Sequence, residues 1–128
     1  MSERSPMEPT PEQREHLEKF REEHDGDPVG DVGTTLLYED DDIKIWEMVL
    51  APGQASDLHE HRYPYYMVIQ GGDVIAGVTP KGSELEPFVG NLPADKPLVA
   101  PRGTGFVEWA YNIGTETYRE VLIELKKG

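Results

Sequence analysis

Short runs of alternating apolar and polar residues fill most of the chain, from about residue 34 to residue 125. The runs are rich in β-branched and aromatic residues, and turn-forming Pro, Gly and Asp residues separate them. Alternation with a period of two indicates strands, because successive side chains of a strand point to opposite faces of the sheet. Short strands at this spacing, with no helix between them, favour an all-β antiparallel sandwich or barrel. The predicted strands are 34–38, 43–50, 65–70, 74–78, 106–113 and 118–125.

Residues 84–99 form the least regular part of this region. Pro87, Pro93 and Pro97 interrupt it, and proline cannot donate a hydrogen bond to a neighbouring strand. The segment therefore predicts only an edge strand and a loop.

The first 33 residues have a different pattern, which predicts one helix. Thr10 is a good N-cap, Pro11 suits the first helical position, and Gln13 can complete a capping box. The helix is expected to end near His24, because Asp25-Gly26 follows. The predicted organisation is a flexible, helical arm over residues 1–33 and a β-barrel domain over residues 34–128.

The apolar stripe of this helix is thin and consists mainly of Leu17 and Phe20. Such a stripe cannot form a core alone, so it can dock either on a sheet or on a partner subunit. His16 and His24 lie on the same acidic helix, and we expect both to be exposed.

The composition indicates an acidic protein, with 25 acidic and 12 basic residues and a net charge of −13. This charge repels polyanions, so neither nucleic acid nor an anionic membrane is an expected partner. The sequence has no apolar run long enough to span a membrane, no secretory signal pattern and no cysteine. A cytoplasmic location is the simplest interpretation. The acidity is typical of an ordinary acidic cytoplasmic protein or of adaptation to high salt, and we favour the first.

Two histidines form the strongest candidate site. In a strand, His59 and His61 present both imidazoles to one face, because residues two apart share a face. Imidazole is a ligand for Zn, Fe, Ni, Cu and Mn, so the pair is a possible start of a metal site. A His-x-His pair also occurs on exposed strand faces and as hydrogen-bonded histidines in a core.

The surroundings of this pair resemble the first motif of the cupin superfamily. Gly53 lies a short distance before His59 and His61, as a glycine does in that family, and Gly72 matches the glycine that follows. Tyr65 stands where the family has a glutamate.

The second cupin motif is also similar to part of this chain. Pro101 and Gly103 match its Pro-x-Gly turn, and Asn112 followed by Gly114 matches its end. Glu108 stands where the family has a third histidine. The resemblance covers about residues 36–126, and the stretch 112–121 is similar to small bacterial cupins assigned to β-alanine degradation.

The resemblance implies an all-β, double-stranded β-helix, a jelly-roll cupin barrel with a short N-terminal helix. It also implies a divalent transition metal (Fe, Mn, Zn, Ni or Cu) bound by His59, His61 and Glu108. Such a site has two histidines and one carboxylate, with open positions as in non-haem Fe(II) sites. In the alternative, the site is degenerate, Tyr65 fills the vacancy and Glu108 only hydrogen-bonds a histidine.

Alternation gives two further alternatives for these residues. Phe106, Glu108 and Ala110 share one face of their strand, but Trp109 and Tyr111 could define the inward face instead. Tyr65 is a candidate catalytic proton donor, because a phenol with a pKa near 10 stays protonated, or it is a weak fourth ligand or core.

Two functions follow from the resemblance. The first is a metal-dependent enzyme acting on a small metabolite, such as a small organic acid, as a dioxygenase or as a lyase or isomerase. The second is a non-catalytic cupin that binds a small molecule and has a degenerate metal site. Small cupins are often dimers, so we expect a homodimer, with the N-terminal arm as a possible clasp.

Overall fold

The computed structural model describes residues 8–127 of the chain. Within this part, one helix, α1 (Pro11–Glu23), precedes a series of strands. The strands are β1 (Thr35–Glu39), β2 (Ile43–Leu50), β3 (His59–Glu60), β4 (Tyr65–Gly71), β5 (Val74–Val78), β6 (Phe88–Asn91), β7 (Leu98–Arg102), β8 (Val107–Asn112) and β9 (Tyr118–Leu125).

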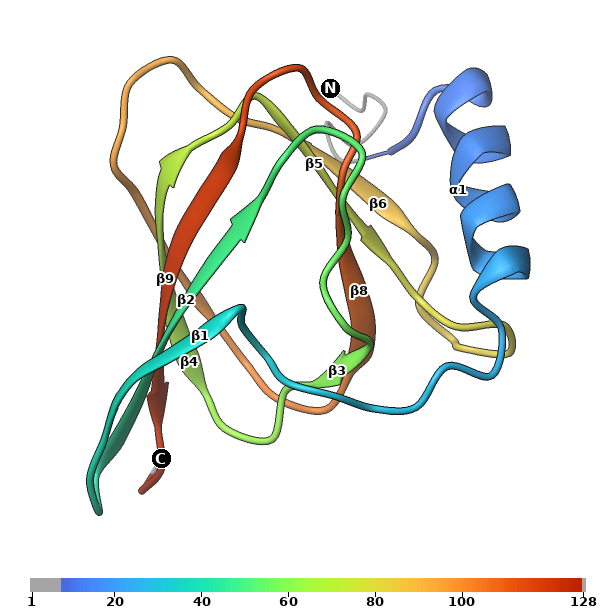
Figure 1. The fold of residues 1–128 in the computed structure, drawn as a ribbon. Helices are drawn as coiled ribbons and strands as arrows, with labels where there is room; N and C mark the ends of the chain where they lie inside the picture. Colours follow the sequence, from blue (N-terminus) through green and yellow to red (C-terminus); the bar gives the residue numbers. More distant parts are fainter. Residues whose placement is uncertain (1–7, 128) are drawn as a thin grey trace, which may run out of the picture.

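The strands form two antiparallel sheets that face each other (Figure 1). One sheet has the order β1-β2-β9-β4-β7, and the other has the order β3-β8-β5-β6. Helix α1 lies on the outside of the four-stranded sheet, away from the five-stranded one (Figure 1). The predicted all-β antiparallel architecture with a short N-terminal helix is confirmed.

The segment 84–99 differs from its prediction, because it contributes to two strands instead of one edge strand and a loop. Strand β6 is the edge of the four-stranded sheet, and β7 is the edge of the five-stranded sheet. Pro101 was expected in a turn, but it lies within β7 opposite Tyr66 of β4. An edge strand has a free side that needs no N–H donor, so a proline there breaks no ladder.

Helix α1 begins as predicted, with Thr10 and Gln13 forming a capping box. Its stripe is fully buried: Leu17 is 0% exposed and Phe20 is 5% exposed. The Phe20 ring packs edge-on against Trp109 of β8, with ring centroids 5.5 Å apart. Of the two expected docking modes, the helix therefore uses the first and covers a sheet of its own chain.

The two glycines of the first motif both adopt backbone conformations that other residues rarely adopt. Gly53 has φ +86° in the turn after β2, and Gly72 has φ +114° between β4 and β5. A side chain at Gly72 would also press on Tyr118, because an added Cβ would lie 3.0 Å from its ring. Glycine at these positions is a requirement of the turns that bring the strands together.

Asn112 closes one end of the barrel and is completely buried. Its side-chain amide donates hydrogen bonds of 2.9 Å to the carbonyl oxygens of Leu50 and Glu116, and its Oδ1 accepts one from the Gly114 amide. The hydrogen bonds of the Asn112 side chain therefore join the ends of β2, β8 and β9.

The described residues include no helix with both the length and the apolar character that crossing a membrane requires.

Candidate metal centre

The register of β3 and β8 brings two of the predicted ligands face to face. His59 is directly opposite Glu108 in this antiparallel pair. Opposed residues point to the same face of a sheet, so the imidazole and the carboxylate project together into the barrel. His61 lies just beyond β3, where its backbone N–H donates to the Phe106 carbonyl at 3.1 Å and keeps the same alternation.

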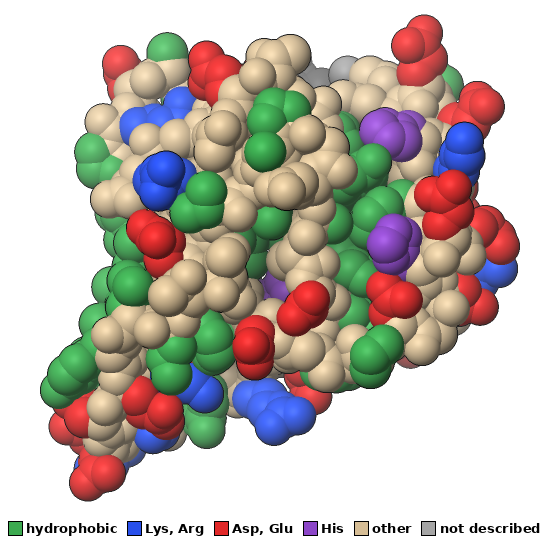
Figure 2. Space-filling view, in the orientation of Figure 1, with side chains coloured by type: hydrophobic (Ala, Val, Ile, Leu, Met, Phe, Trp, Pro, Cys, Tyr) green, Lys and Arg blue, Asp and Glu red, His purple; other side chains and the backbone are tan. Residues whose placement is uncertain are grey.

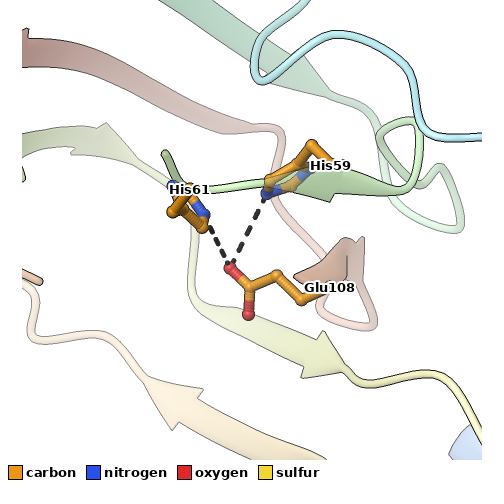
Figure 3. Close-up of side chains that lie close together, drawn as sticks. All are labelled: His59, His61 and Glu108. Atoms are coloured by element: carbon orange, nitrogen blue, oxygen red, sulfur yellow. Dashed lines mark hydrogen bonds and ion pairs between the residues drawn. The ribbon is translucent and has the colours of Figure 1, made fainter. Parts of the chain in front are cut away.

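The three side chains converge on one carboxylate oxygen (Figure 3). Glu108 Oε2 lies 3.3 Å from His61 Nε2 and 3.7 Å from His59 Nε2. One ligand atom from each residue lies within 4.8 Å of the others, and all three residues are buried. The group could therefore hold a metal ion.

The sequence left open whether the Glu108 side chain points into the barrel, because its neighbour Trp109 is the more apolar residue. In the structure β8 is buried on both faces. Glu108 faces the space between the sheets, whereas Trp109 faces α1 and is 2% exposed. The alternative in which Trp109 and Tyr111 define the inward face is therefore wrong. It failed because a helix covers the outer side of the strand.

Burial opposes charge on His59 and Glu108, and the attraction between imidazole and carboxylate outweighs it. Burial acts to raise the pKa of Glu108, but the two imidazoles lower it below its usual value. Burial acts to lower the pKa of His59, but the Glu108 carboxylate raises it above the usual value. The group therefore favours a carboxylate beside a protonated imidazole, and this proton must leave when a metal binds.

The surroundings of the group fit a bound cation. Glu108 Oε1 is buried, and no described residue hydrogen-bonds it. Gly77 leaves room beside this oxygen, since a Cβ added there would lie 2.8 Å from it. His59 Nδ1 lies 2.9 Å from the Asp57 carbonyl, a partner that directs Nε2 to a metal. His61 Nδ1 has no such partner among residues 8–127.

Tyr65 lies at the edge of the same group and is 3% exposed. Its ring stacks on the His61 imidazole, with centroids 4.2 Å apart, and its hydroxyl lies 3.4 Å from His61 Nε2. Burial, and then the Glu108 and Glu120 carboxylates, raise the pKa of the Tyr65 phenol above its usual value. The hydroxyl therefore stays protonated beside the candidate ligands.

The group lies in the wall of a cavity of about 580 Å³ between the two sheets. Sequence reasoning missed two polar residues that also line it, Tyr118 and Glu120 of β9. The Tyr118 hydroxyl donates to Glu120 Oε1, and Glu120 is 4% exposed. Burial raises the pKa of Glu120 to about 7, although the Tyr118 hydrogen bond and His59 act in the opposite direction.

Comparison with solved structures identifies the architecture. A cupin domain from Bordetella pertussis Tohama I superposes with a TM-score of 0.60 at 19% identity, over 76% of this chain and 99% of that one. The chain has the cupin fold. The predicted double-stranded β-helix is therefore confirmed, and the His59–His61–Glu108 group lies within a cupin barrel.

Two further cupin-like structures agree with this assignment. A conserved protein with a double-stranded β-helix domain from Klebsiella pneumoniae gives a TM-score of 0.53 at 20% identity, over 83% of this chain and 86% of that one. An RmlC-like cupin from Methanocaldococcus jannaschii gives 0.50 at 12% identity, over 75% and 93% of the two chains. No protein-family model and no curated protein matches the sequence.

Proposed function

We propose that the protein is a metal-dependent enzyme that binds a divalent transition metal through His59, His61 and Glu108 and acts on a small metabolite. The observation that supports this most strongly is the buried convergence of two imidazole nitrogens and one carboxylate oxygen within 4.8 Å of one another. A carboxylate is costly to bury without a cation, so this group has a physical reason to bind one.

The proposed chemistry is that of a dioxygenase or of a lyase or isomerase. When bound, the metal supplies a Lewis acid and a template for substrate or oxygen, because three protein ligands leave coordination positions open. The chain's own residues exclude water: the two histidines are 1% and 2% exposed, and the cavity walls are mostly apolar.

Tyr65 is the proposed proton donor. Its hydroxyl lies 3.4 Å from His61 Nε2, and its raised pKa keeps the proton on the phenol at neutral pH. A protonated hydroxyl at this edge of the group can donate a hydrogen bond, or a proton, to an oxygen atom of a bound substrate.

The test is the metal content of protein purified without a histidine tag, for the wild type and His61→Ala. We expect about one metal ion per wild-type chain and a large loss in the variant, because removing one of three ligands opens the site. His16→Ala is the matched control, since His16 is exposed on α1 and should leave the metal content unchanged.

A wild-type protein that refuses Fe, Mn, Zn, Ni and Cu would contradict the proposal. The non-catalytic cupin that binds a small molecule with a degenerate site would then be the better account.

We also propose that the protein is a cytoplasmic homodimer. The outer face of the five-stranded sheet carries many apolar residues, and Figure 2 shows hydrophobic side chains exposed on the left of the view, where this sheet lies. Tyr66 is 43% exposed and Val99 is 57% exposed. We call this surface the outer apolar face; it consists of Ile45, Val49, Tyr66, Val68, Val99, Val121 and Ile123.

A second copy of the chain is the proposed occupant of the outer apolar face. Two copies with a net charge of −13 repel each other, but this face carries the balanced pair Glu47 and Arg119, 3.6 Å apart. Two such faces related by a twofold axis can place each acid near the other copy's base. Helix α1 lies on the opposite side, so the proposed dimer no longer uses the arm as a clasp (Figure 1).

A further inference from the structure

We propose that the cavity binds an uncharged, largely apolar ring compound, and that Tyr118 and Glu120 form a second polar subsite that recognises a hydroxyl group of this ligand. The inference deepens the proposed function, since the same cavity contains the candidate metal centre. The role of this ligand as a substrate rests on the proposed function, but its binding to the cavity does not.

The walls of the cavity favour an apolar ligand. The volume of about 580 Å³ falls within the range typical of small-molecule sites, which is roughly 300–1,000 Å³. Aliphatic, thioether and aromatic groups form most of the surface between the sheets. They include Met67, Ile69, Ile75, Phe88, Leu98 and Phe106. A flexible polar metabolite would lose water here without gaining hydrogen bonds.

Among the polar residues of the cavity, two pairs lie on opposite sheets. His59 and Glu108 belong to β3 and β8 of the four-stranded sheet, whereas Tyr118 and Glu120 belong to β9 of the five-stranded sheet. A ligand that fills the space between the sheets would contact both pairs of polar residues, and apolar side chains would surround its middle.

The Tyr118–Glu120 pair is built to receive a hydroxyl group. Tyr118 is 2% exposed, and its hydroxyl donates a hydrogen bond to Glu120 Oε1. This bond holds the carboxyl group in one orientation. A carboxylate has about four acceptor positions, so it retains the capacity to accept a hydrogen bond from a ligand. Strand β9 has another buried glutamate, Glu124, but the Trp46 indole donates to it at 2.8 Å and it does not line the cavity.

The charges of the cavity disfavour an organic acid. Glu86, Glu108 and Glu120 line the cavity, and its cationic groups are the protonated imidazole that offsets Glu108 and the Arg102 guanidinium. Arg102 is exposed, so water screens it. A carboxylate ligand would have to leave water for a space in which acidic side chains outnumber cationic ones. This differs from the small organic acid expected from the sequence.

The test is calorimetric titration of the chelator-treated, full-length protein with three probes that share one ring system. They are 2-naphthol, 2-methoxynaphthalene, which cannot donate a hydrogen bond, and 2-naphthoate, which is an anion. At pH 8, where the Glu120 carboxyl group is mostly ionised, we expect 2-naphthol to bind about tenfold more tightly than the methyl ether, the effect of one hydrogen bond to a charged group. We expect no measurable binding of 2-naphthoate.

Two matched variants assign the preference to Glu120. Glu120→Gln should remove most of the preference for 2-naphthol over the ether, because a neutral amide is a weaker acceptor than a carboxylate. Glu124→Gln, a change of the same residue type on the same face of β9, should leave the preference intact. A third variant, Tyr118→Phe, should weaken 2-naphthol binding, because it removes the hydrogen bond that orients the Glu120 carboxyl group.

An unchanged preference in Glu120→Gln, or 2-naphthoate binding as tightly as 2-naphthol, would overturn the inference. Because the protein is free of metal in this experiment, such a failure is separate from a failure of the proposed metal centre. Loss of metal binding in a protein that still binds 2-naphthol would overturn only the proposed function.

Discussion

Three glutamates lie buried in this barrel, and each is stabilised by a different neighbour. Glu108 faces two imidazoles, Glu120 accepts a hydrogen bond from the Tyr118 hydroxyl, and Glu124 accepts one from the Trp46 indole N–H. Of the three, only Glu108 faces imidazoles, and its pKa is lowered, whereas burial raises the pKa of Glu120 to about 7. The neighbouring groups, more than the degree of burial, therefore decide which buried carboxyl group is charged at neutral pH.

The raised pKa of Glu120 makes stability depend on pH. The group binds its proton more tightly when folded, so its contribution is fully present below pH 4.5 and is lost as pH rises through about 7. The chelator-treated Glu120→Gln variant should lack this loss. At pH 8 its free energy of unfolding should exceed that of the wild type by about 3 kcal/mol. Urea unfolding at pH 5 and pH 8 measures the difference.

The control for this prediction is Glu124→Gln, which should follow the wild-type pH dependence. A Glu120→Gln variant whose stability falls between pH 5 and pH 8 as steeply as the wild type would refute the assignment to Glu120.

Gly77 of β5 should be needed for metal binding although it is not a ligand. A Cβ there would overlap the Phe88 ring and would lie 2.8 Å from Glu108 Oε1, so both side chains would have to shift. Gly77→Ala should therefore displace the carboxylate and weaken metal affinity by about tenfold or more, as outer-shell changes do. Gly90→Ala is the matched control, since it also lines the cavity but a Cβ there would come no closer than 3.5 Å to its neighbours. Equal metal affinity in the two variants would contradict this.

At the scale of elements, the alternating pattern predicted most strands but could not always say which face points inward. In β8 the alternation grouped Glu108 with Ala110, and the structure agrees. In β9 the outward residues Val121 and Ile123 are more apolar than the inward Glu120, so the pattern alone suggests the wrong face. The subsite at Glu120 was missed for this reason.

The strands of the proline-interrupted segment, β6 and β7, were the other part that the sequence did not predict. Strands β6 and β7 pair on one side only, so they lack the regular signal of a central strand. The candidate site was more predictable, because the resemblance to the cupin motifs pointed to His59, His61 and Glu108, and the register of β3 and β8 places His59 opposite Glu108.

Helix α1 should stabilise the barrel. Leu17→Ala should lower the free energy of unfolding by about 3 kcal/mol, because it leaves a cavity at a residue that is 0% exposed. Lys19→Ala, on the exposed side of the same helix, should change it by less than about 0.5 kcal/mol. Denaturant unfolding of both variants measures this. A Leu17→Ala protein as stable as Lys19→Ala would mean that the arm of residues 1–33 is independent of the barrel.

At the scale of the whole molecule, the two sheets have different surroundings. The four-stranded sheet is covered by α1, whereas the outer apolar face of the five-stranded sheet has no covering element in the described chain (Figures 1 and 2). A protein with a net charge of −13 is well solvated elsewhere, so this face is where association gains most.

The proposed dimer predicts a specific sensitivity to charge. Val99→Lys should produce a monomer in sedimentation velocity, because two such faces would bury uncompensated ammonium groups. Val29→Lys is the control, since Val29 is 52% exposed and Val99 57% exposed, but only Val99 lies on the outer apolar face. A wild type that sediments as a monomer would contradict the dimer, as would a Val99→Lys variant that remains dimeric.

The central claim is that Glu108 completes a metal centre with the two histidines. The most direct measurement compares the metal content of the wild type, Glu108→Gln and Glu120→Gln after each is loaded with the same metal and dialysed. We expect about one ion per chain in the wild type and in Glu120→Gln, and a large loss in Glu108→Gln, because a neutral amide is a poor ligand. Glu108→Gln protein that retains as much metal as the wild type would contradict the claim.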